Sequence, residues 1–289
     1  TVKFFAESVG REVAIASYRS RDVDALTAAT AVARIRPARY VMAGPGSPSY
    51  ALRQWAGGPI PPALASLLRD GGILTMASAA ALTLGAVTIP IYEVYKVGEE
   101  PTWLPGLDLL REATGLRAAV VPHYDNAEGG NHDTRFCYMG ERRLRILEGL
   151  LPADTFVLGV DSHTALVLDL DHGSASISGL GGVTVRVDGR SAVFPSGSEM
   201  AIEALAEAAR SLASGGAPDV SMGSSGSGAS FAGADIAGLV TGEAPRAATT
   251  IGQASAELEG AFFAALAGGD TAAAVAALLD FDTAIESRS

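Results

Sequence analysis

The segment around Ser78 has the residue types that a nucleophilic serine needs. It reads GGILTMASAAALTLG, in which an apolar, strand-like run ends just before Ser78 and an alanine-rich helical run follows. A tight strand-to-helix turn exposes its central side chain at the carboxyl edge of a sheet, and it has room only for small neighbours. Ala77 and Ala79 meet this demand, and the Ala79 N–H would face an oxyanion formed during acyl transfer. The simpler interpretation is that Ser78 caps the helix.

Three further segments follow buried, strand-like runs and can complete such a site. The loop Gly44–Gly46 (GPG) can bring its backbone close to a ligand and supply a second N–H to an oxyanion, or it is an ordinary strand–helix turn. His123 follows AAVVP and can take the Ser78 proton as a general base, or it has a structural role. Asp161 ends TFVLGVD and can orient His123 through its other ring nitrogen, or cap the turn. We expect these side chains to meet at one edge of a sheet.

The same region is rich in histidine and aspartate, which opens a second kind of chemistry. These residues occur as H-x-D, H-D and D-x-H, and imidazole with carboxylate is a donor set for zinc or manganese. The spacing matches no strong metal-binding motif. A metal-dependent hydrolase is therefore a separate hypothesis, whereas the preferred interpretation involves no metal and no other cofactor. The ligands in the metal hypothesis would come from His123, Asp125, His132, Asp133, Asp161 and His163.

Six polar side chains near these segments are candidates for substrate binding. They are Tyr92, Glu93, Lys96, Asp125, Asn126 and Arg135. The first three lie in AVTIPIYEVYKVGEE, after the helix that follows the serine, and the next two follow the histidine. The arginine can hold a substrate carboxylate through two parallel hydrogen bonds. Loop packing and a solvent-exposed charged face explain the same residues without a ligand.

Alternating strands and helices must position all of these residues. Buried, strand-like runs lie at 39–44, 73–77, 118–122 and 155–161, with helical runs between them. This alternation predicts an α/β domain with a mostly parallel sheet and helices on both faces. Short alternating runs between residues 164 and 194 predict antiparallel hairpins at the edge of that sheet.

The composition changes after Phe194 and predicts three parts. Residues 1–195 form the α/β domain, and residues 196–230 hold a helix at 199–213 and a Gly/Ser-rich linker. Residues 231–289 contain two alanine-rich stretches and form a helical C-terminal extension. This extension packs on its own domain or on a second copy of the chain, which would make a homo-oligomer. The chain opens inside a helix-like segment, so we expect a truncated N-terminus that lacks an upstream strand.

Charge and composition narrow the class of partner. The formal net charge is −11 and no run of lysine or arginine occurs, which disfavours nucleic acid and anionic membranes. No apolar run is long enough to span a bilayer, and we expect a cytoplasmic protein. The single cysteine, Cys137, excludes an internal disulfide and a thiolate metal cluster.

Taken in order, these segments resemble one family of enzymes. The series strand–GxG, strand–xSA–helix, strand–PHYD and GVDxxTALV is similar to the cyanophycinase and aspartyl dipeptidase family of serine peptidases, over about residues 10–190. The resemblance implies a class I glutamine amidotransferase-like, flavodoxin-like fold. It also implies metal-free cleavage of peptide or isopeptide bonds next to aspartate. Ser78 would then be the nucleophile and His123 the base, with Gly44, Gly46 and Ala79 forming the oxyanion hole.

Two positions depart from the family pattern. The family elbow reads Gly-x-Ser-Ala-Gly-Ala, whereas Met76 and Ala80 replace the two glycines here, which requires negative φ at both positions. The family acid is the second residue of an Asp-Glu pair, and Ser162 stands there in this chain. Asp161, Asp125 or Glu128 can replace the missing acid, or the triad is incomplete.

Three hypotheses follow from these observations. The first is a serine hydrolase that cleaves a peptide, isopeptide or amide bond in a small substrate. The second is a catalytically impaired member of the family that binds a ligand or a protein. The third is the metal-dependent hydrolase described above.

Overall fold

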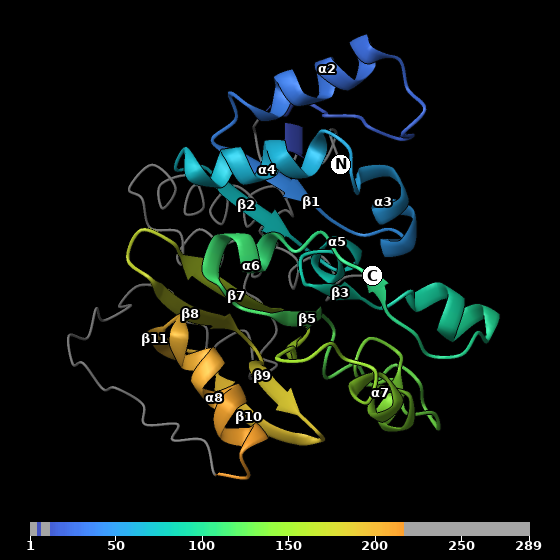
Figure 1. Ribbon diagram of the computed structural model, residues 1–289, viewed down its shortest axis with the longest axis vertical. Coiled ribbons are helices and arrows are strands. Elements are labelled where there is room, and N and C mark those ends of the chain that lie inside the picture. The colour runs from blue at the N-terminus through green and yellow to red at the C-terminus, as the bar shows by residue number, and fades with distance from the viewer. Residues whose placement is uncertain (1–4, 7–11, 217–289) are drawn as a thin grey trace, which may run out of the picture. The chain divides into compact units, whose positions relative to one another are not determined.

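The computed structural model describes residues 5–6 and 12–216. From residue 13 onward these residues belong to one compact unit of mixed α/β structure (Figure 1). Most of the predicted N-terminal helix, most of the predicted linker and the whole predicted extension at 231–289 lie outside the described residues. The mixed α/β class expected from the sequence is confirmed.

Two parallel strands and three helices form the first part of this unit. The elements are α2 (Ala25–Ile35), β1 (Tyr40–Ala43), α3 (Pro48–Trp55), α4 (Ile60–Arg69) and β2 (Ile73–Met76). β1 and β2 pair in parallel, α2 packs on α4, and α4 covers β2. Buried aliphatic residues of both helices share a core with Val41 and Leu74 of the strands. The carboxyl ends of both strands therefore open toward the same edge.

Short elements connect this part to the remaining strands. They are α5 (Ala79–Leu82), β3 (Val87–Thr88), the π-helix η1 (Glu93–Val97), β4 (Leu104–Pro105) and α6 (Leu109–Thr114). β3 and β4 form an antiparallel pair of two residues each. Only Ala77 and Ser78 separate Met76, the last residue of β2, from Ala79, the first residue of α5. π-Helices are rare and often occur at functional sites.

The last part of the unit contains two sheets and two longer helices. The elements are β5 (Ala118–Val121), α7 (Gly140–Glu148), β6 (Phe156–Val160), β7 (Thr164–Asp169), β8 (Ser174–Gly179), β9 (Gly182–Val187), β10 (Arg190–Pro195), β11 (Glu199–Ala201) and α8 (Glu203–Ala213). One sheet has the order β10-β9-β6-β5 and the other the order β11-β8-β7. β5 and β6 are parallel, and the other pairs in these two sheets are antiparallel.

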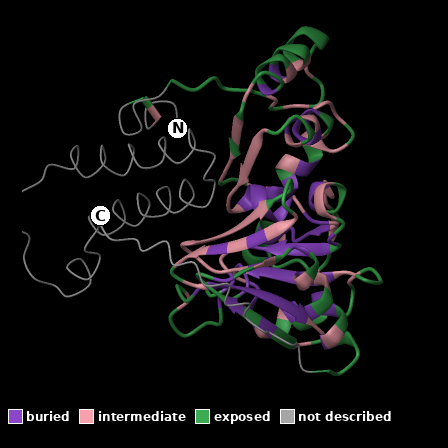
Figure 2. Cartoon of the chain, turned by 90° about the vertical axis from the view of Figure 1, so that its left-hand side faces the viewer, coloured by how far each residue is buried: buried purple, intermediate pink, exposed green. Residues whose placement is uncertain are grey.

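Helices cover both faces of the four-stranded sheet, so β5, β6 and β9 are almost entirely buried (Figure 2). The edge strand β10 has four exposed residues. Phe156 and Leu158 of β6 belong to the core that includes α8. Val157 belongs to a second core with residues of α7. The alternation follows from the period of two along a strand. The sheet is thereby fixed from both sides, which holds the ends of β5 and β6 in place.

A buried ion network joins α7 to β9. The Arg186 guanidinium donates to Glu141 at 2.7 and 3.0 Å and to Glu148 at 2.9 Å, and Gly189 N–H donates to the other Glu148 oxygen. Arg186 is 4% exposed, so both carboxylates are needed to compensate its buried charge. We call these three side chains the Arg186 network.

The structure corrects two expectations about the strands. Among the described residues, two strand pairs are parallel and five are antiparallel, so the sheets are not mostly parallel. The strands from 164 to 195 follow one another through short turns, and such connections produce antiparallel neighbours. The helix expected at 199–213 begins at 203, because residues 199–201 pair with β8.

No helix within the described ranges is both long enough and apolar enough to cross a membrane.

Candidate active site

Ser78 occupies a strained turn between β2 and α5. Its φ is 53° and its ψ is −122°, a conformation that side chains other than glycine rarely adopt. Ala77 N–H donates to Ala43 O at 2.9 Å and Leu82 N–H to Ser78 O at 3.3 Å, so both sides of the turn are held. Met76 and Ala80 do not have positive φ, which explains how the chain dispenses with glycine at both positions. The strain is therefore located at the serine.

The His123 ring lies against the Ser78 hydroxyl. His123 Nε2 is 3.1 Å from Ser78 Oγ, which is within hydrogen-bond range. In the tautomer that carries its proton on Nδ1, Nε2 accepts the hydroxyl proton, as a general base must. Among the described residues, Ser78 is the only recorded hydrogen-bond partner of the ring. The pair therefore has the contact that general-base activation of a serine needs.

The His123 backbone is held by two loops at once. His123 has a φ of 50°, and its carbonyl accepts hydrogen bonds from Asn126 N–H at 3.2 Å and Cys137 N–H at 3.1 Å. Cys137 lies in a turn, Phe136–Tyr138, whose three residues all have positive φ. Non-glycine residues rarely adopt this conformation in succession, so the turn persists because its surroundings hold it. Burial raises the pKa of the Cys137 thiol to about 12, which keeps it protonated.

Backbone N–H groups beside Ser78 are free to bind an anion. Within the described part of the chain, Ala79 N–H, Gly44 N–H and Gly46 N–H have no recorded acceptor. Ala79 is the first residue of α5, and the Gly44–Gly46 loop follows β1, the parallel neighbour of β2. These amides are the donors that the sequence predicted for an oxyanion, and their role remains a prediction.

Asp161 does not reach His123. Its Oδ2 accepts a hydrogen bond from Gly182 N–H at 2.8 Å, and its own N–H donates to Gly182 O at 3.1 Å. Burial raises the pKa of Asp161; the Gly182 hydrogen bond opposes this, and the charge of Asp125 adds to it. No hydrogen bond between Asp161 and the imidazole is recorded in the described region. These contacts agree with the other role expected for Asp161, in which it caps a turn.

Asp125 has a similar structural contact. Its Oδ1 accepts a hydrogen bond from Ser162 N–H at 2.7 Å, which joins the loop after β5 to the turn after β6. Ser162 stands where the resembled family has its acid, and here its backbone serves as a donor to Asp125. The two aspartates therefore stabilise the loops around the site, and neither has a recorded hydrogen bond to His123 among the described residues.

Glu128 follows His123 by five residues and is held by its neighbours. It accepts a hydrogen bond from the Tyr138 hydroxyl, and its N–H donates to Asn126 Oδ1 at 3.1 Å. Hydrogen bonds from Tyr138 and Asn126 lower the pKa of Glu128, and the charge of His123 lowers it further. No hydrogen bond joins Glu128 to the imidazole within the described ranges. The sequence drew no attention to Tyr138, because an isolated tyrosine carries no pattern.

The remaining substrate-binding candidates have partners within the protein. Glu93, on η1, accepts a hydrogen bond from the buried Ser49 Oγ at 2.9 Å. The Lys96 ammonium lies 4.8 Å from the centre of the Tyr92 ring. Arg135 donates to both oxygens of Asp133 at 2.8 Å and lies over the Phe136 ring. Arg135 is thus already engaged in the two-bond contact that we expected it to make with a substrate carboxylate.

The residues that motivated the metal hypothesis make other contacts. No group of three or more histidine, cysteine, aspartate or glutamate side chains in the described residues is arranged to hold a metal ion. The carboxylates concerned bind instead to backbone N–H groups or, in the case of Asp133, to Arg135. The six residues that motivated the hypothesis thus serve different local contacts.

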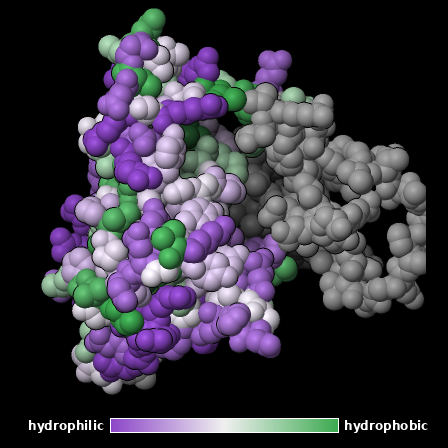
Figure 3. Space-filling view, turned by 90° about the vertical axis from the view of Figure 1, so that its right-hand side faces the viewer, coloured by the Kyte–Doolittle hydropathy of each residue, from purple (hydrophilic) through white to green (hydrophobic). Residues whose placement is uncertain are grey.

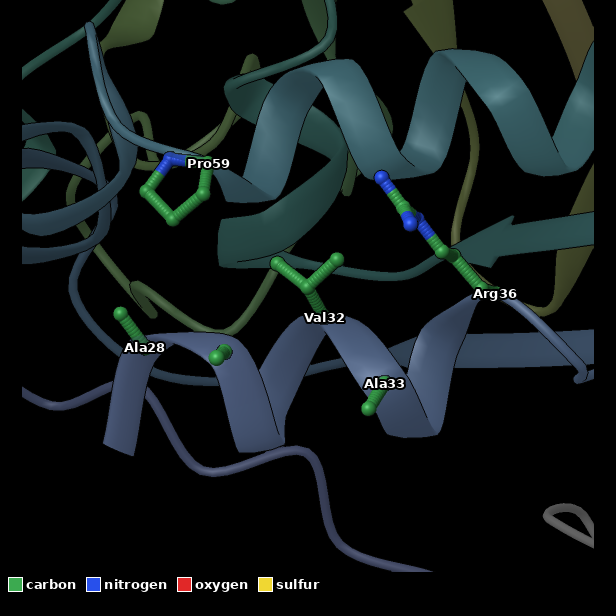
Figure 4. Close-up of a pocket in the computed structure, with 6 residues that line it drawn as sticks. Ala28, Val32, Ala33, Arg36 and Pro59 are labelled. Atoms are coloured by element: carbon green, nitrogen blue, oxygen red, sulfur yellow. The ribbon is translucent and has the colours of Figure 1, made fainter. Parts of the chain in front are cut away.

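Two surface cavities lie near other parts of the unit. The first, of about 410 Å³, is lined by Ala28, Ala29, Val32, Ala33, Arg36 and Pro59. Val32 and Arg36 extend from α2 toward α4 (Figure 4), and none of the lining residues is a predicted site residue.

The second cavity, of about 630 Å³, lies between the η1 region and α7, with Tyr95, His132 and Arg142 among its lining residues. The face that carries α7 mixes hydrophilic side chains with small hydrophobic patches (Figure 3). Tyr95 stacks on Tyr138 with ring centres 4.9 Å apart. The cavity therefore adjoins the loop that holds Glu128.

Comparison with known proteins supports the fold. No family model matches the sequence, and no curated protein is significantly similar to it. A crystal structure of a peptidase from an acI-B1 Actinobacterium is similar with a TM-score of 0.53 and 19% identity, covering 69% of this chain and 73% of that one. A protein described as a peptidase E from Listeria monocytogenes EGD-e has a TM-score of 0.34 and 11% identity, with 61% and 67% coverage. The first similarity shows a shared fold, and the second is too distant to support an argument.

Proposed function

We propose that this chain is a serine hydrolase of the cyanophycinase and aspartyl dipeptidase type, on a class I glutamine amidotransferase-like fold. Ser78 would be the nucleophile and His123 the general base. One observation carries the proposal: Ser78 Oγ and His123 Nε2 are 3.1 Å apart at a serine whose backbone is held at φ 53°. A helix cap does not need either feature. The similarity to a peptidase structure is consistent with the proposal through the fold alone.

The reaction would proceed by acyl transfer. Ser78 Oγ attacks the carbonyl carbon while its proton passes to His123 Nε2, and the carbonyl oxygen becomes an oxyanion. The free N–H groups of Ala79 and of the Gly44–Gly46 loop would stabilise that oxygen. His123 then returns the proton to the leaving nitrogen, and the C–N bond breaks. Water, deprotonated by the same imidazole, releases the acyl group and restores Ser78.

The proposed substrate is a small peptide or another molecule with an amide or isopeptide bond. The site lies at the ends of β2 and β5, where the segments that follow the two strands meet. A small substrate can be held there by loop contacts. In the described part, Arg135 is the one predicted substrate-binding residue that forms an ion pair. The other candidates are Tyr92, Glu93, Lys96, Asp125 and Asn126.

Reaction with a fluorophosphonate probe tests the proposal without knowledge of the substrate. Such probes react with serines whose hydroxyl is activated by a base. We expect covalent labelling of the wild-type chain and none of Ser78→Ala. The matched control is Ser162→Ala, which removes a hydroxyl near the site but leaves the backbone N–H that Asp125 binds. Equal labelling of Ser78→Ala and wild type would reject the proposed nucleophile.

One observation favours the alternative of a catalytically impaired protein that binds a ligand or a protein. Among the described residues, no carboxylate is hydrogen-bonded to His123, and loss of an orienting acid can lower turnover by about 10⁴-fold. The same probe separates the two functions. A folded wild-type chain that does not react with the probe, even after prolonged incubation, supports the impaired protein.

A further inference from the structure

We propose that the cavity between η1 and α7 binds a short peptide with free termini. Arg142 and Arg143 would bind its carboxylate. Glu99 and Glu100 would bind its ammonium group. All four side chains line the cavity, whose volume of about 630 Å³ is typical of small-molecule sites. Neither the proposed nucleophile nor the proposed base lines it, so the inference concerns a second site and does not rest on the proposed function.

One wall of the cavity is a face of α7 that carries two unpaired arginines. Arg142 and Arg143 lie near the start of the helix. Ile146 follows one turn later on the same face and also lines the cavity. Among the described residues, neither arginine has a recorded ion pair. The carboxylate of Glu141, next to them on the helix, is already bound by Arg186. The two cations are therefore left for a ligand.

The other acid on this wall, Asp133, is also engaged. Its Oδ2 accepts a hydrogen bond from Glu141 N–H at 2.9 Å, which caps the first turn of α7. Arg135 binds both of its oxygens at 2.8 Å and balances its charge. The start of the helix is thus already occupied by a side chain. The arginines of α7 are therefore the groups on this wall that can attract an anion.

The loop after η1 forms another wall and carries two unpaired carboxylates. Gly98, with a φ of 87°, ends η1, and the N–H groups of Gly98 and Glu99 both donate to Glu93 O. Pro101 follows Glu100 and restricts the backbone at that point. Within the described ranges, Glu99 and Glu100 have no recorded ion pair. The loop therefore presents two anions from a backbone that is held in place.

The charges of the two walls do not neutralise each other. No recorded ion pair joins the arginines to the glutamates in the described part of the chain, although all of them line one cavity. The lining also includes apolar surface from buried Met139 and from the exposed side chains of Tyr95 and Ile146. A simple anion would use only the arginines, and a simple cation only the glutamates. A short peptide uses both and has apolar atoms between its charged ends.

Calorimetric titration of the full chain with the dipeptide Ala-Leu tests this site, in a Ser78→Ala background that prevents cleavage. We expect Ala-Leu to bind. N-acetyl-Ala-Leu and Ala-Leu amide should each bind about ten-fold more weakly, since each lacks one charged terminus. Arg142→Gln with Arg143→Gln should weaken Ala-Leu by a similar factor but leave the affinity for the amide unchanged, because the amide has no carboxylate. Glu99→Gln with Glu100→Gln should in the same way spare N-acetyl-Ala-Leu.

The matched control is Arg36→Gln with Arg210→Gln, which removes two exposed arginines outside this cavity and should leave every affinity unchanged. The inference is overturned if Ala-Leu does not bind, or if both cavity variants bind it as tightly as their parent. It is also overturned if the arginine variant weakens Ala-Leu and its amide equally. Displacement of Ala-Leu by phosphate, with no effect of the glutamate variant, would reveal a simple anion site and overturn it as well.

The outcomes are separate from those of the proposed function. If Ser78 does not react with a fluorophosphonate but the cavity variants show the expected pattern, the hydrolase fails and the peptide site stands. If Ser78 reacts but the titrations show no dependence on the cavity residues, the hydrolase stands and the peptide site fails. The four replaced side chains have no recorded ion pair among the described residues, so the circular dichroism of each variant should match that of the parent.

Discussion

Two polar clusters near the Phe136–Tyr138 turn differ in how their polar groups are paired. In the Arg186 network, a buried cation is bound by two carboxylates, and the guanidinium lies 5.2 Å from the centre of the Phe136 ring. At the Ser78–His123 pair, the hydroxyl and the imidazole bind each other, while neighbouring backbone N–H groups within the described ranges have no recorded acceptor. The two carboxylates compensate the guanidinium charge without a ligand, although the buried Arg186 Nε has no hydrogen-bond partner among the described residues. The pair instead leaves backbone donors for a ligand.

The two clusters differ in how much backbone strain they contain. The Arg186 network lies between regular elements, α7 and β9. The pair lies where two strands end, and both of its residues have positive φ. Strained residues of this kind persist where the surroundings hold them, and they concentrate at functional sites. The two clusters should therefore respond differently to substitution, one through reactivity and the other through stability.

The largest expected effect concerns His123. His123→Asn keeps a residue that tolerates positive φ but removes the base, so labelling by the fluorophosphonate should slow by about 10⁴-fold. The midpoint of urea unfolding should stay close to that of wild type. Labelling within about ten-fold of wild type would show that Ser78 is not activated by this imidazole.

The next largest effect concerns the Arg186 network. Glu148→Gln leaves the buried arginine with one carboxylate fewer, and breaking a buried ion pair typically costs about 3–5 kcal/mol in the free energy of unfolding. Urea denaturation followed by circular dichroism measures this cost. The folded fraction should still react with the probe at the wild-type rate.

A double variant sharpens this prediction. Arg186→Met with Glu148→Leu removes both charges and should be more stable than Glu148→Gln alone, because no uncompensated charge is left between these two positions. A single variant as stable as wild type would instead show that the network is not a source of stability.

A pH dependence of stability should also come from the network. The hydrogen bond from Arg186, with help from Arg145, lowers the pKa of Glu141 from 4.5 to about 2. Ionised Glu141 therefore stabilises the folded state fully above its unfolded pKa. This contribution to the free energy of unfolding is lost as pH falls from about 4.5 through 2. Urea midpoints should decline over that window, and Glu141→Gln should show a shallower decline. Identical slopes would exclude Glu141 as a contributor.

The smallest expected effect is a gain in stability at Ser78. Glycine adopts positive φ without strain, so Ser78→Gly should raise the free energy of unfolding by about 1–2 kcal/mol. The same variant should lose all labelling. Gly72→Ala is a useful contrast, because its added Cβ would lie 2.4 Å from a Leu67 side-chain atom and should destabilise the chain. Unchanged stability of Ser78→Gly would show that the turn is not strained.

Much of the scaffold follows from local patterns in the sequence. The runs before Ser78 and His123 form β2 and β5, and the alternating runs after residue 164 form β7 to β10. Apolar runs that end in small or polar residues specify such strands well. The two-residue strands β3 and β4 and the π-helix η1 were not predicted. A strand of two residues is too short to show a periodic pattern in the sequence. The π-helix η1 depends on contacts such as the one between Glu93 and Ser49.

The site was only partly predictable, because side-chain direction depends on distant partners. The contact between Ser78 and His123 joins the ends of β2 and β5, which belong to separate sheets and not to the single sheet expected from the sequence. The direction of Asp161 depends on Gly182, which comes from the antiparallel strand β9. The Phe136–Tyr138 turn contains no glycine or asparagine to signal positive φ. Arg186 lies next to Val185 in an alternating strand pattern, which predicts a solvent-facing side chain. In the structure, α7 covers that side of the sheet and buries Arg186.

The most direct test of the central claim is the position of the covalent adduct. Wild-type protein is treated with a fluorophosphonate, digested, and mapped by mass spectrometry. The account predicts one adduct, on the peptide that contains Ser78, and its loss in His123→Asn. An adduct on a neighbouring serine such as Ser47, with Ser78 unmodified, would contradict the account.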